Sequence, residues 1–357
     1  MTSQQTSSRF SAQSGTRNTL LRILITGAVM LLGMTASHAA WLHDDADVMG
    51  TRITVELFHP DASVAQQGVD AVIAEMHRID NNMSPWIETS ELARLNRDAA
   101  EKPVTVSREF FDLIERTLSF SRMTDGAFDI TFASVGFLYD FREGVRPDDR
   151  QRQQAAALIN YLNLQLDDTD RTIHYSKPGV RIDLGGIAKG HAVDRSIELL
   201  QSLGIEQALV TAGGDSRTVG ERWGRPWNIG VRHPDDADKL VAVIPLQDVA
   251  VSTSGDYQRY FDEDGVRYHH IINPDSGDSA RGLRSVTIIG TDATTTDALS
   301  TSVFVLGLKK GMDLVNRLPG IDAILVDAHG RLHYSNELLP AKKPDDSVKA
   351  TTESVTH

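Results

Sequence analysis

Hydrophobic and polar residues alternate along most of the chain with periods typical of strands and helices. Residues 49–58 alternate at every second position and predict a half-buried strand, whereas residues 63–83 repeat apolar positions at helical spacing. A short helix is expected near 92–96, and a further helix from Ser107, a typical N-cap residue, to 123. Further strands are expected at 172–175, 179–183, 207–211, 227–231, 240–245, 249–253, 268–272, 283–289, 321–326 and 332–334, and further helices at 148–165, 192–203 and 297–308. Because strands and helices do not alternate strictly, the pattern favours an α+β fold with mixed or antiparallel sheets flanked by helices.

The beginning of the chain has the pattern of an export signal. Three arginines and no acidic residue precede or flank an apolar run at 23–34, and small residues follow and end at Ala39. This order predicts a signal peptide over 1–39, cleaved after Ala39, and a periplasmic protein. The apolar run is shorter than the roughly 20 residues that span a bilayer, and an uncleaved anchor is the alternative. A folded domain is expected over 40–338, followed by a disordered polar tail at 339–357.

The composition limits the chemistry that the chain can perform. Its 357 residues include no cysteine, and the formal net charge is −13. Without cysteine there is no thiol nucleophile, no disulfide, no thiolate-bound metal and no lipid anchor on a cysteine. A metal ion would therefore be held by oxygen or nitrogen ligands. The acidic balance argues against a nucleic-acid partner, since binding to the phosphate backbone needs a basic face.

A glycine-rich loop connects a predicted strand to a predicted helix. Its sequence is Asp183-Leu-Gly-Gly-Ile-Ala-Lys-Gly190. Glycines allow the backbone to approach a phosphate closely, a helix start offers free N–H groups, and Lys189 adds a positive charge. The loop is neither a Walker A motif nor a dinucleotide-binding Gly-x-Gly-x-x-Gly motif. The alternative is that it serves only as a turn.

A second segment combines a carboxylate with a hydroxyl. Asp297 and Thr301 are four residues apart and share one face of the predicted helix. Together with carbonyl oxygens they would form an oxygen-only site of the kind that suits Mg²⁺. The alternative is that Asp297 is a favourable charge at a helix start and that Thr301 bonds back to the preceding turn.

Two adjacent histidines, His269 and His270, lie in the segment 268–274. A histidine with a pKa near neutrality can act as a general base. The alternative is a structural histidine whose polar atoms are satisfied inside the fold. The sequence contains neither a His-Glu-x-x-His motif nor a Gly-x-Ser-x-Gly elbow, so a zinc hydrolase and a serine hydrolase of those types have no support.

Taken together, these segments resemble the ApbE family of FAD:protein FMN transferases, over about residues 49–327. The motifs that carry the resemblance are, in chain order, Met49-Gly-Thr51; Met83-Ser-Pro-Trp86 with Ser90-Glu-Leu92 and Asn96; Gly126-Ala-Phe-Asp129 with Thr131; Asp183-Leu-Gly-Gly-Ile-Ala-Lys-Gly190 with Asp194; Ala212-Gly-Gly-Asp215; Ser252-Thr-Ser-Gly-Asp256; His270-Ile-Ile-Asn-Pro274 with Gly277; and Asp297-Ala-Leu-Ser-Thr301. Each motif is weak by itself, but eight in the family's order are specific.

The resemblance implies a two-lobed fold, with lobes at roughly 48–180 and 181–338 and FAD in the cleft between them. It implies Mg²⁺-dependent transfer of the FMN half of FAD to a Thr or Ser hydroxyl of a target protein, with release of AMP. Family targets are subunits of membrane redox complexes. The implied metal site consists of the side chains of Asp297 and Thr301 and the carbonyls of Gly186 and Ser300. The implied FAD-lining residues are Met49, Trp86, Ala127, Phe128, Asp129, Asp183, Lys189 and one of Ile271 or Ile272. His270 would help deprotonate the acceptor hydroxyl, and Asp297 would be catalytic as a metal ligand.

The chain departs from the family pattern at two positions. Asn273 stands where members commonly have Asp, and His191 where they commonly have Tyr. Many members also carry a lipid-anchoring cysteine, which this chain lacks. Two other functions remain open from the sequence. One is an FAD diphosphatase that gives FMN and AMP, and the other is a non-catalytic flavin carrier, which would not need Asp297, Thr301 and His270 together.

Overall fold

A large antiparallel sheet forms the centre of the computed structural model, which describes residues 40–234 and 236–339. Its eight strands lie in the order β1 (Ala40–Val48), β2 (Thr51–His59), β6 (Gln207–Ala212), β7 (Asp215–Val219), β10 (Ala250–Gly255), β15 (Leu283–Gly290), β16 (Asp322–Asp327) and β17 (Leu332–Tyr334). Each neighbouring pair is antiparallel. Because β2 pairs directly with β6, the segments 48–180 and 181–338, expected as lobes, share one sheet.

The predicted signal peptide at 1–39 and residues 340–357 of the predicted tail lie outside the described residues. Across the described part of the chain, no helix combines the length and the apolar character that a bilayer crossing requires.

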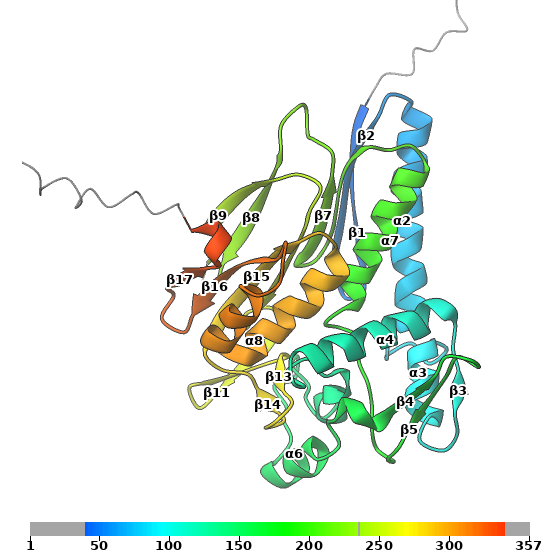
Figure 1. Ribbon diagram of the computed structural model, residues 1–357, viewed down its shortest axis with the longest axis vertical. Coiled ribbons are helices and arrows are strands. Elements are labelled where there is room, and N and C mark those ends of the chain that lie inside the picture. Colours follow the sequence, from blue (N-terminus) through cyan, green and yellow to red (C-terminus); the bar gives the residue numbers. More distant parts are fainter. Residues whose placement is uncertain (1–39, 235, 340–357) are drawn as a thin grey trace, which may run out of the picture.

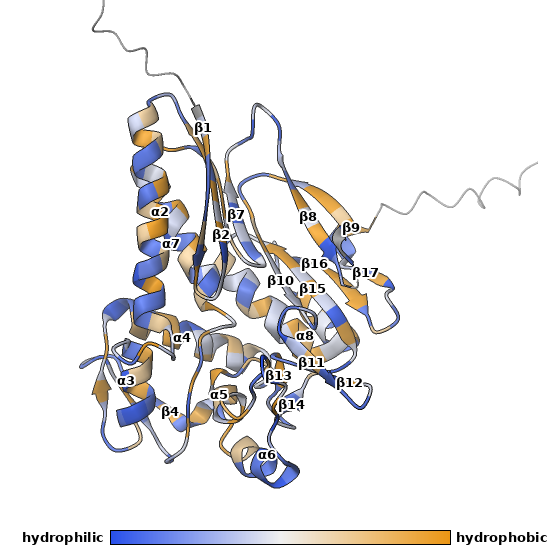
Figure 2. Cartoon of the chain, turned by 180° about the vertical axis from the view of Figure 1, so that it is seen from behind, coloured by the Kyte–Doolittle hydropathy of each residue, from blue (hydrophilic) through white to orange (hydrophobic). Residues whose placement is uncertain are grey.

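Three long helices pack side by side against one face of this sheet (Figure 1). They are α2 (Ala62–Met83), α7 (Ala188–Ser202) and α8 (Ala293–Val315). The helix α2 buries Val69, Val72, Met76 and Ile79 at helical spacing, and Figure 2 shows its mixture of hydrophobic and hydrophilic stretches. This burial against β1, β2 and α7, more than helix propensity, holds the helix in place.

Residues between α2 and α7 form a second body at the lower end of Figure 1. It contains α3 (Glu91–Asp98), α4 (Arg108–Met123), α5 (Ala133–Gly136), α6 (Asp149–Ala156) and a three-stranded sheet in the order β3 (Val104–Thr105), β5 (Thr172–Tyr175), β4 (Leu164–Asp167). Short 3₁₀ turns lie at Ile130–Phe132 and Tyr161–Asn163. The helix α4 contacts α8, so this body meets the helical layer of the large sheet.

Three hairpins complete the described chain, with a 3₁₀ turn at Asn336–Leu338. They are β8 (Trp227–His233) with β9 (Asp236–Leu246), β11 (Tyr260–Glu263) with β12 (Val266–His269), and β13 (Ile272–Asn273) with β14 (Asp278–Ser279). His270 directly follows β12, and the second hairpin therefore determines where this residue lies.

The α+β fold with antiparallel sheets is confirmed, but the helix predicted at 148–165 is wrong in its second half. The helix α6 ends at Ala156. The side chain of Asn160 then accepts a hydrogen bond from the backbone N–H of Leu162, which begins a 3₁₀ turn. Residues after this turn pair with β5, because their alternating apolar side chains are buried by the small sheet.

The strand predicted at 179–183 is also wrong. This segment belongs to no sheet, since Gly179 lies in a turn with a φ of 86° and loop groups take the backbone hydrogen bonds of the residues that follow. The N–H of Arg181 donates to the Ser134 hydroxyl, and the N–H of Ile182 donates to the Asn96 side chain. The predicted strand at 268–272 is interrupted, since β12 ends at His269 and β13 begins at Ile272. The strands β1 and β7 were not expected.

Candidate active site

The glycine-rich loop and the first turns of α8 lie against each other because two glycines leave room for close approach. A Cβ atom placed on Gly190 would lie 2.1 Å from the carbonyl oxygen of Ala293 and 2.8 Å from Cβ of Asp297. A Cβ atom on Gly186 would lie 3.3 Å from Thr301 Oγ1 and 3.3 Å from the Phe128 ring. The two motifs, more than 100 residues apart in the sequence, therefore form one site.

Lys189 lies among oxygen atoms at this junction. Its Nζ is 3.0 Å from Asp215 Oδ2, 3.0 Å from the carbonyl oxygen of Gly185 and 3.5 Å from each carboxylate oxygen of Asp297. Asp215 and Asp297 are both buried. Lys189 was predicted to line the FAD site, and the structure shows that its ammonium group lies beside two carboxylates.

Burial and the nearby Asp215 carboxylate raise the pKa of Asp297 to about 7. The positive charge of Lys189 and the N–H of Gly190, which donates to Asp297 Oδ2 at 3.0 Å, act in the opposite direction. Burial disfavours the charged form of Lys189, but its two carboxylate neighbours outweigh this cost and raise its pKa. The site therefore carries a charged lysine at neutral pH.

The face of α8 that carries the predicted metal ligands is buried beside β10. The hydroxyl of Ser254 on β10 is hydrogen-bonded to Ser300 Oγ at 2.7 Å and lies 3.3 Å from Thr301 Oγ1. Ser300 Oγ also donates to the carbonyl oxygen of Asp297 at 2.8 Å. The helix begins at Ala293, with Asp292 as its N-cap, so Asp297 is not a charge at the helix terminus. This removes the main alternative explanation of Asp297.

The residues at this junction fit a hard divalent cation. The side chains of Asp297 and Thr301 and the loop backbone at Gly186 supply only oxygen donors, which Mg²⁺ prefers. The absence of a Cβ on Gly186 lets the loop reach the hydroxyl of Thr301. Within the described ranges, no three His, Asp or Glu side chains converge in a metal-binding arrangement, so hydroxyl and carbonyl oxygens would have to complete the site.

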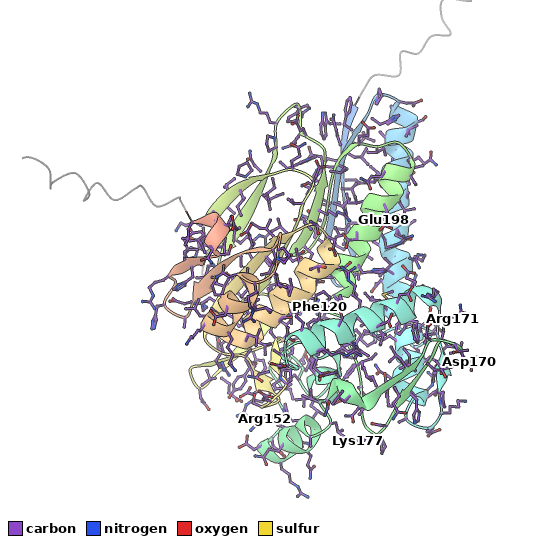
Figure 3. The ribbon with its side chains drawn as sticks, in the orientation of Figure 1. Phe120, Arg152, Asp170, Arg171, Lys177 and Glu198 are labelled. Carbon is purple, nitrogen blue, oxygen red and sulfur yellow. The ribbon has the colours of Figure 1, made fainter. Side chains whose placement is uncertain are left out.

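Phe128 and Asp129, both predicted to line FAD, are buried next to this junction. The Phe128 ring meets Phe120 of α4, labelled in Figure 3, edge to face at 6.0 Å. Asp129 Oδ1 accepts from the backbone N–H and the hydroxyl of Thr131, and Oδ2 accepts from the backbone N–H of Tyr161. The sequence suggested no partner for this acid. Asp129 therefore organises its loop, and burial raises its pKa.

The other FAD-lining candidates of the first half are at the surface or in turns. Trp86 is 75% exposed and meets Phe137 edge to face at 5.1 Å. Ala127 donates its N–H to the carbonyl of Thr124. Met49 has a φ of 56° and forms the β1–β2 turn with Gly50, so the expected strand starts only at Thr51.

Asp183 begins the glycine-rich loop and also organises it. Its Oδ1 accepts the N–H of Gly185 at 2.6 Å, and burial raises its pKa.

The two adjacent histidines have different environments. His269 is buried and satisfied, since its Nε2 contacts the carbonyl of Ala280 at 2.8 Å and its Nδ1 accepts the N–H of Ile271. Burial lowers its pKa to about 4. His270 follows the hairpin and donates its backbone N–H to the carbonyl of Arg259. Burial and the charge of Arg259 lower its pKa to about 3.

Within the described residues, Nδ1 of His270 is buried without a hydrogen-bond partner. His270 therefore has a neutral, unengaged ring, whereas His269 is structural. Of the two candidate isoleucines, Ile271 packs in the main core and Ile272 packs against Val135 and Tyr139.

The two departures from the family pattern have local partners. His191 Nε2 lies 2.9 Å from Glu109 Oε1, in a network with Arg78 that connects α2, α4 and α7. The side chain of Asn273 accepts the N–H of Asp275 at 2.9 Å and closes the β13–β14 turn. Neither residue disrupts the junction of α7 and α8.

Sequence reasoning assigned no role to Asp194 or Asp215. Asp194 receives hydrogen bonds from the first residues of α8 and pairs with Arg217, and Asp215 pairs with Lys189. Both acids lie inside motifs quoted for the family resemblance. Their position beside glycines and a helix start was the available signal, but it did not reveal their partners.

Comparison with known proteins shows which family the chain is similar to. The model of the ApbE family matches residues 49–325. The FAD:protein FMN transferase of Treponema pallidum is 32% identical over 308 residues, covering 81% of this chain and 85% of that protein. The one from Klebsiella pneumoniae strain 342 is 34% identical over 285 residues, covering 79% and 87%.

Among solved structures, the ApbE protein of Thermotoga maritima superimposes with a TM-score of 0.77 at 36% identity, covering 84% of this chain and 98% of that one. The flavin transferase ApbE from Vibrio cholerae has a TM-score of 0.74 at 29% identity, with the same coverage. Sequence and fold thus agree along most of the chain, which belongs to the ApbE family.

Proposed function

We propose that this chain is a Mg²⁺-dependent FAD:protein FMN transferase. It would move the FMN half of FAD to a Thr or Ser hydroxyl of a target protein and release AMP. The observation that carries the proposal is the convergence of Lys189, Asp297, Thr301 and the loop around Gly186 at the junction of α7 and α8. Membership of a family whose relatives are named FAD:protein FMN transferase supports the same activity.

The reaction breaks the phosphoanhydride linkage of FAD and forms a phosphate ester to the acceptor hydroxyl. The acceptor oxygen forms a bond to the phosphorus of the FMN half, and the bond from that phosphorus to the bridging oxygen breaks. AMP leaves with that oxygen. The diphosphate carries negative charge throughout, so the site must supply positive charge and N–H donors. The Lys189 ammonium group and the backbone of the glycine-rich loop at the start of α7 can supply both.

The metal ion would be held by the side chains of Asp297 and Thr301, with the carbonyls of Gly186 and Ser300. When bound, Mg²⁺ neutralises charge on the diphosphate oxygens and on the departing AMP. The contacts of the Ser254 hydroxyl with the hydroxyls of Ser300 and Thr301 hold this face of α8 in place. Phe128, packed against Phe120, borders the junction on the side of Gly186.

His270 would remove the proton of the acceptor hydroxyl. Its low pKa keeps the imidazole neutral at physiological pH, as a proton acceptor must be. Since Nδ1 is enclosed, the proton is accepted at Nε2. The negative charge of bound FAD would raise the pKa of His270 and make it a stronger base in the complex.

The test mixes purified protein with FAD, Mg²⁺ and an acceptor flavoprotein domain, and follows in-gel flavin fluorescence and AMP release. A labelled acceptor together with AMP supports the proposal. AMP without a labelled acceptor indicates the FAD diphosphatase, and bound FAD without either product indicates the flavin carrier.

A matched pair of variants on α8 tests the metal site. Asp297→Asn should lower transfer by about 10²–10³-fold, whereas Asp313→Asn, on the exposed face of the same helix, should retain it. Equal Mg²⁺-dependent activity in both variants would contradict the assignment of Asp297.

We also propose that the chain works in the periplasm on a subunit of a membrane redox complex. The basic, apolar and small-residue order of residues 1–39 supports export. Cell fractionation and N-terminal sequencing of the mature protein test this proposal. An N-terminus at Ala40 in the periplasmic fraction is expected, and retention of residues 1–39 in the membrane fraction would indicate the anchor instead.

A further inference from the structure

Asp215 is a buried carboxylate for which the proposed reaction has no direct use. Its side chain is only 3% exposed, and it faces Lys189 across 3.0 Å. Lys189 Nζ is 3.5 Å from the nearest oxygens of Asp297, so the ammonium group lies closer to Asp215 than to the proposed metal ligand. Because the attraction between charges falls with distance, Asp215 is the stronger partner of the two.

The backbone around Asp215 makes it a rigid anchor. Asp215 pairs with Ala212 across the β6–β7 turn on one side and with Ser252 of β10 on the other. The turn residue Gly213 has a φ of 63°, and a Cβ atom there would lie 2.6 Å from Thr51 Oγ1. The turn is thus confined by β2 as well, and the Asp215 carboxylate has little freedom to follow Lys189.

The pairing of Lys189 with Asp215 affects how strongly Lys189 competes with the metal ion for the Asp297 carboxylate. A lysine ammonium group and a divalent cation cannot both approach the same carboxylate closely without repelling each other. If Lys189 lost its partner, the remaining buried carboxylate within reach would be Asp297, and the flexible four-carbon side chain of lysine could move to it. The cation would then have to displace Lys189 before binding.

We infer that Asp215 is a positioning residue that holds the Lys189 ammonium group away from Asp297 and so keeps this carboxylate available to the metal ion. The inference rests on the proposed metal site and adds a function for a residue outside it. Asp215 contacts neither the reacting atoms nor the cation, and acts through Lys189.

The test is a double-mutant cycle with Mn²⁺ as the probe and binding as the readout, measured by the paramagnetic resonance signal of free Mn²⁺. The purified protein is used as Asp215→Asn, Lys189→Met and the double variant. Asp215→Asn should weaken Mn²⁺ binding about tenfold while Lys189 is present, and less than about twofold in the Lys189→Met background. Lys189→Met alone should tighten Mn²⁺ binding, because it removes the competing cation.

A simple charge effect predicts a different result, since the loss of one negative charge would weaken Mn²⁺ binding equally in both backgrounds. That outcome, or an unchanged affinity of Asp215→Asn, overturns the inference. If Asp215→Asn does not fold, the Lys189→Met variant alone tests the inference. Weaker Mn²⁺ binding in Lys189→Met would contradict the competition between Lys189 and the cation. Asp256→Asn is the matched control: it removes another buried carboxylate, one that pairs with Arg284, and should leave Mn²⁺ affinity within about twofold.

The failure of this inference differs from the failure of the proposed function. If the unsubstituted chain binds no Mn²⁺, both the metal site and this role of Asp215 are overturned. The other case is that the unsubstituted chain binds Mn²⁺ and transfers FMN. If Asp215→Asn then weakens Mn²⁺ binding equally with Lys189 present and in the Lys189→Met background, only the inference is overturned.

Discussion

The Asp194 carboxylate on α7 receives two hydrogen bonds from Thr294 at the start of α8, at 2.8 Å from its backbone nitrogen and 2.5 Å from its hydroxyl. Its other oxygen accepts the N–H of Ala293 at 2.8 Å and pairs with Arg217 of β7 at 2.8 Å. These contacts satisfy backbone donors that a helix start leaves free. One carboxylate thus fixes the helix that carries Asp297 to both α7 and the sheet.

Asp194→Ala should therefore destabilise the protein and misplace α8. It leaves two buried N–H groups and Arg217 without their partner, and we expect a loss of about 3 kcal/mol in the free energy of unfolding. Chemical denaturation measures this loss, and FMN transfer should fall even in the folded fraction. The control is Glu198→Ala on the same helix, labelled in Figure 3, which pairs at the surface with Arg195 and should cost less than about 0.5 kcal/mol. Equal effects of the two variants would contradict the capping role.

Gly190→Ala should destabilise the protein although alanine is the better helix former. Alanine normally gains about 1 kcal/mol over glycine inside a helix. At Gly190, however, the added methyl group would lie 2.1 Å from the backbone oxygen of Ala293, and we expect a net loss of about 1–3 kcal/mol.

Gly68→Ala in α2 is the comparison for Gly190→Ala. Its methyl group would meet the flexible side-chain end of Ile205 at 2.5 Å. This side chain can move, so the loss should be smaller than at Gly190. The denaturant midpoints of both variants measure these losses of stability. A larger loss for Gly68→Ala than for Gly190→Ala would contradict the close contact of α7 and α8.

His270→Asn should lower transfer without changing the pH profile of kcat/KM, which reports the free enzyme, between pH 5 and 8. The pKa of about 3 means that the free enzyme has lost this proton well below pH 5. A general base of this kind contributes about 10²–10⁴-fold, which is the expected fall in kcat. The exposed His329→Asn should retain activity. An acidic limb of kcat/KM near pH 6.5 that disappears in His270→Asn would show that His270 titrates normally.

His269 should make the protein less stable in mild acid. The pKa of His269 falls from about 6.5 when unfolded to about 4 when folded, so below pH 6.5 the unfolded chain binds a proton that the folded protein does not accept. Stability from the neutral ring is complete above pH 6.5 and falls as the pH drops toward 4. At pH 5 the loss in the free energy of unfolding is about 2 kcal/mol. Urea denaturation at pH 7 and pH 5 should show this difference between the unsubstituted protein and His269→Asn. Equal losses in both would contradict the prediction.

Local patterns predicted most of the elements, because they depend on neighbouring residues. Ser107 accepts the N–H of Phe110 as an N-cap of α4, and Gly204, with a φ of 78°, follows the end of α7. The prediction of a strand at 179–183 was wrong because residues distant in the sequence determine its hydrogen bonds. No strand forms there, because the side chains of Ser134 and Asn96 take the backbone N–H groups of Arg181 and Ile182.

The sequence by itself determined the family, the kinds of groups in the site and the helix face shared by Asp297 and Thr301, since short motifs and helical spacing are local properties. Only the tertiary structure decided which charges meet. Lys189, Asp215 and Asp297 come from α7, β7 and α8, and the backbone contact at Gly190 brings α7 and α8 together. Likewise, His269 and His270 are adjacent in the chain, but burial and hydrogen bonding make the first structural and leave the second free. Side chains that are distant in sequence are paired by packing, which no local pattern records.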